Sequence, residues 1–211
     1  MRLGHVKKLI LIDCDGTCYP AVPNFNGQFR TALKDTAAAF GISLETYDSI
    51  GQQVRGQHRG MMNFILALCQ GDLTRFQDFT RLWCDRLDYT HIQADPILGK
   101  NLESLPVPAC IFTNNCRTHL DRVWQRLFNG RAPRTPVLTI EDTYDGRWFH
   151  PKQSADGFLR VCESQKVLPI NTVVLDDSPS IVDIARQTGL QARLITRQYP
   201  LVIHLAELTR E

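Results

Sequence analysis

The sequence predicts an α/β fold, with a mostly parallel sheet between helices and an all-helical unit inserted after the first strand. Two observations predict it. Short apolar runs at residues 9–12, 108–112, 136–140, 172–175 and 192–196 alternate with amphipathic stretches from residue 106 onward. Such alternation produces right-handed crossovers and parallel strand pairing. Between residues 29 and 105 the apolar spacing is helical and no strand is evident.

Length and composition limit the kind of protein. A chain of 211 residues with 43% hydrophobic and 22% charged residues is long enough for one well-buried core carrying a smaller insertion. No apolar run approaches the roughly 18 residues of a membrane span, so no membrane partner is expected. The net charge is +2 with scattered Lys and Arg, which argues against a polymeric nucleic acid as partner. The sequence specifies no oligomeric state.

The cysteines indicate a reducing compartment. There are seven, an odd number, and none forms a Cys-x-x-Cys pair. Several lie in apolar runs, where a thiol acts as a small hydrophobe. With no signal-like segment at the N-terminus, we expect a cytoplasmic protein. Cys14 and Cys18 flank two aspartates, but no cationic partner is evident that would make either thiol a nucleophile.

The first strand, residues 9–12, ends at two aspartates one residue apart, Asp13 and Asp15, followed by Gly16 and Thr17. Ionised carboxylates beside apolar surface are costly unless a cation or several donors compensate them. Carboxylate oxygens are hard ligands that suit Mg²⁺, which also binds substrate phosphate. This segment therefore predicts a magnesium site, with an Asp-rich turn as the plainer alternative.

A loop and a run of helices follow. Residues 19–27 contain two prolines, two asparagines and a glycine, which predicts an irregular flap. From residue 29 we expect four or five helices, divided by Gly41, Gly60 and Gly71. Their apolar positions follow helical spacing: Leu33, Ala37, Phe40, Phe64, Ile65, Leu68, Phe76, Phe79, Leu82 and Trp83.

The later strands also end in polar residues. Residues 108–112 lead into Thr113, Asn114 and Asn115, and residues 172–175 lead into Asp176, Asp177 and Ser178. In an open α/β sheet the functional site lies beyond the carboxyl ends of the strands. We therefore expect these segments to meet Asp13 and Asp15 in one site. The alternative for the last segment is a helix N-cap.

The order Asp13-Cys-Asp15-Gly-Thr, then Thr113, Lys152 and Asp176-Asp177, resembles the haloacid dehalogenase-like hydrolase superfamily. The resemblance spans nearly the whole chain. It implies a Rossmann-like catalytic core formed by residues 1–27 and 106–211. It also implies a helical cap domain formed by residues 28–105.

The resemblance makes Asp13 the nucleophile that takes the phosphoryl group as an aspartyl-phosphate. Asp15 would protonate the leaving alcohol and then activate water, and its backbone carbonyl would reach the metal. True dehalogenases differ at this second position, because cleavage of a carbon–halogen bond needs no proton donor. Asp15 therefore favours phosphatase chemistry, with a small phosphorylated metabolite as the partner.

The remaining motif residues receive supporting roles from the same resemblance. Thr113 and Asn114 would bind the phosphoryl oxygens. Lys152 would neutralise the charge of the phosphoryl group and of Asp13. Asp177 would bind Mg²⁺, and Asp176 would be a second ligand or act through water.

The substrate expectation rests on a finer similarity to the pyrimidine 5′-nucleotidase-like group. Cys18-Tyr-Pro, Asp95-Pro96 and the Phe-Thr-Asn end of the second strand are similar to that group. Gly16, Gln153 and Ile181 depart from it, since Asn, Pro and Asn are usual there. We expect hydrolysis of a nucleoside 5′-monophosphate. The alternatives are a phosphatase for sugar or glycolate phosphates and a non-catalytic regulatory relative.

A basic segment of the insertion is a candidate for leaving-group contacts. Arg55, His58 and Arg59, with Met61 and Met62, could hold a base or a second charge. The alternative is a solvated basic helix face.

Overall fold

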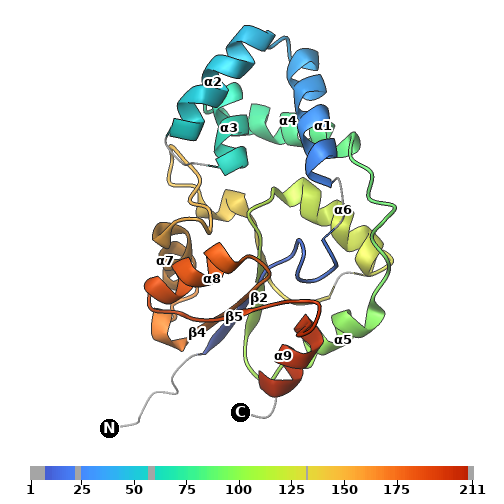
Figure 1. The fold of residues 1–211 in the computed structure, drawn as a ribbon, viewed down its shortest axis with the longest axis vertical. Coiled ribbons are helices and arrows are strands. Elements are labelled where there is room, and N and C mark those ends of the chain that lie inside the picture. Colours follow the sequence, from blue (N-terminus) through green and yellow to red (C-terminus); the bar gives the residue numbers. More distant parts are fainter. Residues whose placement is uncertain (1–7, 22–24, 57–59, 132, 209–211) are drawn as a thin grey trace.

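The computed structural model describes residues 8–21, 25–56, 60–131 and 133–208. Within these residues it contains a five-stranded parallel sheet in the order β3-β2-β1-β4-β5 (Figure 1). The α/β prediction is confirmed. The strands are β1 (Leu9–Ile12), β2 (Ala109–Phe112), β3 (Val137–Leu138), β4 (Thr172–Asp176) and β5 (Gln191–Leu194).

Strand β1 lies at the centre of the sheet, and all four of its residues are buried. Its alternate side chains enter two apolar cores. Ile10 and Ile12 pack on the side of α6 (Arg117–Leu127) and α9 (Leu201–Leu208). Leu9 and Leu11 pack on the side of α7 (Ala155–Ser164) and α8 (Pro179–Gln187). An aliphatic run without polar alternation is what a strand covered on both faces requires. Because the strands are parallel, the residues that follow β1, β2 and β4 emerge at one edge.

The helices form two groups. Figure 1 shows α1–α4 gathered at one end of the molecule, whereas the other helices lie around the sheet. We call α1–α4 the four-helix unit. Its members are α1 (Phe25–Ala39), α2 (Leu44–Gly56), α3 (Gly60–Leu68) and α4 (Leu73–Asp85). The others are α5 (Pro96–Glu103), α6 (Arg117–Leu127), α7 (Ala155–Ser164), α8 (Pro179–Gln187) and α9 (Leu201–Leu208).

Helix α5 packs on the sheet-containing part, although the sequence grouped it with the insertion. It lies beside α9 (Figure 1), and the Asp95 amide before it donates to the Leu127 carbonyl at 2.7 Å. The division at residues 27/28 and 105/106 stays a prediction. None of the helices in the described ranges combines the length and apolar character needed to cross a bilayer.

The segment after β2 is less regular than the sequence suggested. Of residues 136–140, only Val137 and Leu138 form a strand, and residues 140–143 form a 3₁₀ helix. The Asp142 carboxylate accepts hydrogen bonds from the Thr139 amide at 2.7 Å and hydroxyl at 3.1 Å. A side chain that caps the backbone in this way starts a helical turn and ends the strand.

Asn63 joins the four-helix unit to the rest of the molecule. It lies on α3, is buried, and makes a reciprocal pair of hydrogen bonds with the Phe149 backbone. Its amide donates to the Phe149 carbonyl, and its carbonyl accepts from the Phe149 amide, both at 2.9 Å. Phe149 also packs against Phe76 of α4. The unit is therefore bonded to the segment that leads into Lys152.

We predict that Asn63→Ala lowers the free energy of unfolding by about 2–4 kcal/mol, because it leaves two buried backbone groups unpaired. Urea unfolding monitored by circular dichroism measures the change. Asn171→Ala is the matched control, since that side chain is half-buried and bonds to no described residue. A loss for Asn63→Ala no larger than that of the control contradicts the assignment.

Candidate active site

Lys152 brings the ends of two strands together. Its ammonium group donates to Asp13, which follows β1, and to Asp176 at the end of β4, the second bond being 2.7 Å long. Lys152 and both carboxylates are buried. Lys152 lies 139 residues from Asp13 in sequence, yet the three side chains form one buried ionic cluster. The predicted convergence of these segments is thus present.

The cluster contains more acid than base. Burial raises the pKa of Asp13 to about 7, Lys152 opposes the rise, and repulsion from Asp176 and Asp15 adds to it. Burial acts to lower the pKa of Lys152, but the two carboxylates outweigh it, so that this pKa lies above its usual value. Lys152 therefore stays charged. One cation does not balance the neighbouring carboxylates.

Three carboxylates present oxygens to one another. Asp13, Asp176 and Asp177 each place an oxygen within 4.8 Å of the others. Among the described residues, Asp13 Oδ2 is buried and has no hydrogen-bond partner. Asp177 is half-buried, and burial followed by repulsion from Asp176 raises its pKa. A hard divalent cation fits such a site, since it supplies the missing positive charge.

Asp176 differs from the other two in its bonding. Its Oδ2 accepts from Lys152, and its Oδ1 accepts from the Ser178 amide at 3.0 Å. Both oxygens are therefore engaged within the protein. Asp13 and Asp177 are the carboxylates better placed to bind a metal directly, and Asp176 holds Lys152.

Asp15 lies in a separate set of donors. The Tyr19 hydroxyl donates to its Oδ1, and the His119 Nε2 lies 2.8 Å from the same oxygen. Its Oδ2 accepts from Asn115 at 2.8 Å and from Thr113 at 3.3 Å. Burial acts to raise the pKa of Asp15. The charge and hydrogen bond of His119, with the bonds from Tyr19 and Asn115, outweigh burial and hold this pKa well below its usual range.

Thr113 and Asn114 lie at the site, with contacts that the sequence did not indicate. The Thr113 hydroxyl accepts from the Asn115 amide at 3.0 Å while donating to Asp15. The Asn114 side chain accepts from the Lys152 amide at 2.8 Å and donates to Gln153 at 3.0 Å. Asn114 therefore holds the loop that carries Lys152. Phosphoryl binding by Thr113 and Asn114 stays a prediction.

Apart from Thr113, the partners of Asp15 received no role in the sequence analysis. Asn115 belongs to a polar strand end that was recognised as a whole, and Tyr19 lies within the predicted flap. His119 gave no separate signal, because it shares the buried face of α6 with Val123 and Leu127 at a spacing of four residues.

The basic segment predicted near the site is only partly described. His58, Arg59 and the side chain of Arg55 lie outside the described residues. Met61 lines a cavity between the four-helix unit and the site, and Met62 lines it too.

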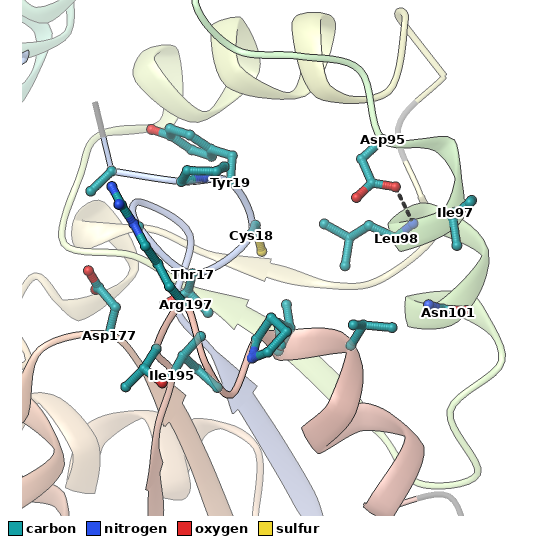
Figure 2. A pocket seen from close by; sticks show the side chains of 17 residues that line it. Thr17, Cys18, Tyr19, Asp95, Ile97, Leu98, Asn101, Asp177, Ile195 and Arg197 are labelled. Carbon is teal, nitrogen blue, oxygen red and sulfur yellow. Dashed lines mark hydrogen bonds between the residues drawn. The ribbon is translucent and has the colours of Figure 1, made fainter. Parts of the chain in front are cut away.

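Cavities lined by described residues adjoin the candidate site. The first, of ≈ 550 Å³, lies between the loop after β1, helix α5 and the segment that links β5 to α9. Figure 2 shows Asp177, Ile195 and Arg197 on one side of it, with Asp95, Leu98 and Asn101 on the other. The second, of ≈ 420 Å³, lies between the four-helix unit and the strand ends. Its walls include Phe29, Arg30, Met61, Asn114 and Gln153.

Comparison with known proteins identifies similar folds. No protein-family model and no curated sequence matches the chain. A 2-haloacid dehalogenase from Pseudomonas syringae pv. Tomato DC3000 has a TM-score of 0.61 at 20% identity, covering 97% of this chain and 99% of that one. CbbY from Rhodobacter sphaeroides, in complex with phosphate, has a TM-score of 0.55 at 17% identity, covering 92% and 88%.

A third similar structure is the HAD hydrolase, family IA, variant 3 from Entamoeba histolytica HM-1:IMSS. Its TM-score is 0.55 at 12% identity, covering 97% of this chain and all of that one. At these identities the likeness concerns the fold. The chain therefore has the fold of haloacid dehalogenase-like hydrolases.

Proposed function

We propose that the protein is a Mg²⁺-dependent phosphatase that hydrolyses a small phosphate monoester, a nucleoside 5′-monophosphate, through an aspartyl-phosphate. One observation carries this proposal. Lys152 bonds to Oδ1 of Asp13, whereas Oδ2 is buried and has no hydrogen-bond partner among the described residues. Asp13 and Asp177 each place a carboxylate oxygen within 4.8 Å of the other. A carboxylate so placed can attack phosphorus once its charge is compensated.

The first step is transfer of the phosphoryl group to Asp13. A carboxylate oxygen of Asp13 forms a bond to phosphorus, the bond from phosphorus to the leaving oxygen breaks, and Asp15 gives that oxygen a proton. Lys152 offsets the negative charge that gathers at Asp13. Bound Mg²⁺, held by Asp13 and Asp177, would supply further positive charge at the phosphoryl oxygens.

The second step is hydrolysis of the aspartyl-phosphate. Asp15 takes a proton from water as the water oxygen attacks phosphorus, and the bond from phosphorus to Asp13 breaks. The products are the alcohol, released in the first step, and inorganic phosphate. The donors around Asp15 stabilise its ionised form, which suits the role of base. To carry a proton in the first step, Asp15 must give up some of these bonds.

Asp15 also supports a phosphatase over a dehalogenase, although a 2-haloacid dehalogenase is among the similar folds. Breaking a carbon–halogen bond requires no proton donor. A second carboxylate held by four side chains next to Asp13 is therefore suited to a leaving group that must be protonated.

The second cavity supports a nucleotide substrate. Its walls offer aromatic and thioether surface from Phe29 and Met61, amides from Asn114 and Gln153, and the cation of Arg30. Such a wall can stack on a base and hydrogen-bond its edge. A sugar phosphate is the second candidate, because CbbY, of similar fold at 17% identity and a TM-score of 0.55, was solved with xylulose-(1,5)bisphosphate.

We predict that Asp13→Asn lowers the Mg²⁺-dependent hydrolysis of p-nitrophenyl phosphate by at least about 10³-fold, as expected for loss of a nucleophile. Burial raises the pKa of Asp13 and so disfavours its charge. The metal-free variant should therefore be at least as stable to heating as the wild type, which separates lost chemistry from misfolding. Equal rates in the two proteins would exclude an enzyme that uses Asp13.

We predict that Gly16→Ala weakens Mg²⁺ binding about tenfold or more, as changes next to metal ligands commonly do. Gly16 has φ +91°, and a Cβ there would lie 2.2 Å from Asp177 Oδ2, so the carboxylate must move. Isothermal titration measures the affinity. Gly41→Ala is the control, with φ +73° and nothing within 4 Å of its Cβ. Similar affinities in both variants would show that Asp177 is not a ligand.

We predict that nucleoside 5′-monophosphates give the highest kcat/KM in a panel that also contains sugar phosphates and glycolate phosphate. Released phosphate measures each rate, with Asp13→Asn as the blank. A preference for sugar or glycolate phosphates would replace the nucleotide assignment with the second candidate and leave the phosphatase assignment intact.

A further inference from the structure

His119 is a buried histidine that itself exchanges no proton in the steps above. It lies on α6 and is fully buried. Its Nε2 is 2.8 Å from Asp15 Oδ1, and its Nδ1 is 3.0 Å from the Tyr89 hydroxyl. Tyr89 lies in the segment between α4 and α5. The imidazole ring thus lies between Asp15, which we propose to act as acid and then as base, and the segment that follows the four-helix unit.

The partners of the two ring nitrogens of His119 indicate which nitrogen donates a hydrogen bond to which group. An ionised carboxylate only accepts hydrogen bonds, so Nε2 carries a hydrogen and donates it to Asp15. The Tyr89 hydroxyl can donate to Nδ1 or accept from it, so it pairs with the ring in either form. His119 Nε2 is therefore the donor to Asp15, and the Tyr89 hydroxyl, bonded to the other ring nitrogen, Nδ1, holds the ring in this orientation.

Aromatic rings also hold the imidazole in place. The Phe29 ring of α1 meets it nearly edge-on, with centroids 5.8 Å apart and an interplanar angle of 86°. The Tyr89 ring lies 5.5 Å away at 49°. Phe29 is itself held by Trp83 of α4, whose indole donates to the Phe29 carbonyl at 3.3 Å. Helix α1 of the four-helix unit thus contacts this ring directly, and so does Tyr89 in the segment that follows α4.

We propose that His119 is a positioning residue that holds the Asp15 carboxylate in place for proton transfer, with Tyr89 and Phe29 fixing the ring. The inference rests on the proposed function and adds a residue to it. Without His119, Oδ1 of Asp15 keeps only the Tyr19 hydroxyl among these donors, and the carboxylate gains freedom to rotate.

The test uses the dependence of rate on the leaving group. An alkoxide must be protonated as it leaves, whereas p-nitrophenolate leaves without a proton. The value of kcat/KM reports the steps up to release of the leaving group. We expect His119→Ala to lower kcat/KM about 100-fold for an alkyl phosphate and about threefold or less for p-nitrophenyl phosphate, since general acid catalysis is of this size.

His119→Gln is the rescue variant, because its amide can place a donor where Nε2 lies. We expect it to recover kcat/KM for the alkyl phosphate to within about tenfold of the wild type. Tyr89→Phe removes the hydroxyl with little change of shape and should cause a smaller loss of the same selective kind. If His119→Ala does not fold, Tyr89→Phe still tests whether the loss of kcat/KM is selective for the alkyl phosphate.

His204→Ala is the matched control, since His204 is a buried histidine on α9 and should leave both rates unchanged. Thermal unfolding of each variant records its stability. Equal losses on the two substrates, or no recovery with His119→Gln, would overturn the inference. If the wild-type protein is inactive on both substrates, the proposed function is wrong. If activity requires Asp13 but His119→Ala leaves the ratio of kcat/KM for the two substrates unchanged, only this inference is wrong.

Discussion

The buried ion pairs of Lys152 with Asp13 and Asp176 are the interaction on which the arrangement of the site depends. They connect the ends of β1 and β4 through a loop that lies 139 residues after Asp13 and 24 residues before Asp176. A buried charge is tolerated only with a partner, so the Lys152 ammonium group requires at least one of these carboxylates. Their charges do not cancel, because Asp13, Asp176 and Asp177 face one lysine. The excess of negative charge makes a divalent cation the natural further component.

Two carboxylates separated by one residue have opposite electrostatic environments. For Asp13 burial dominates, and its pKa rises to about 7. For Asp15 the surrounding donors dominate, and its pKa lies well below the usual range. When their environments shift the pKa values of two carboxyl groups in opposite directions, the two groups can take different chemical roles. One carboxylate faces the cation and phosphorus in our proposal, and the other exchanges protons.

The four-helix unit contacts both sides of this site. Through Asn63 it is bonded to Phe149, three residues before Lys152. Through Phe29 it reaches His119 and hence Asp15. The unit therefore supports the residues of the site as well as enclosing the cavity above the strand ends. A shift of these helices would therefore displace the side chains of Lys152 and Asp15.

The sequence by itself determined the α/β fold and the polar ends of β1, β2 and β4, because short aliphatic runs that alternate with amphipathic stretches and stop at polar residues are typical of buried parallel strands. It also indicated Asp13, Asp15, Lys152, Asp176 and Asp177 as site residues, because carboxylates and an amine are side chains that bind cations and phosphate. It did not reveal His119, which lies 104 residues from Asp15 and has the spacing of an ordinary core position. The use of Asp176 to hold Lys152, and the packing of α5 beside α9, were likewise decided by tertiary structure. Hydrogen bonds between distant segments leave no periodic trace in a sequence, since they depend on which surfaces meet after the chain has folded.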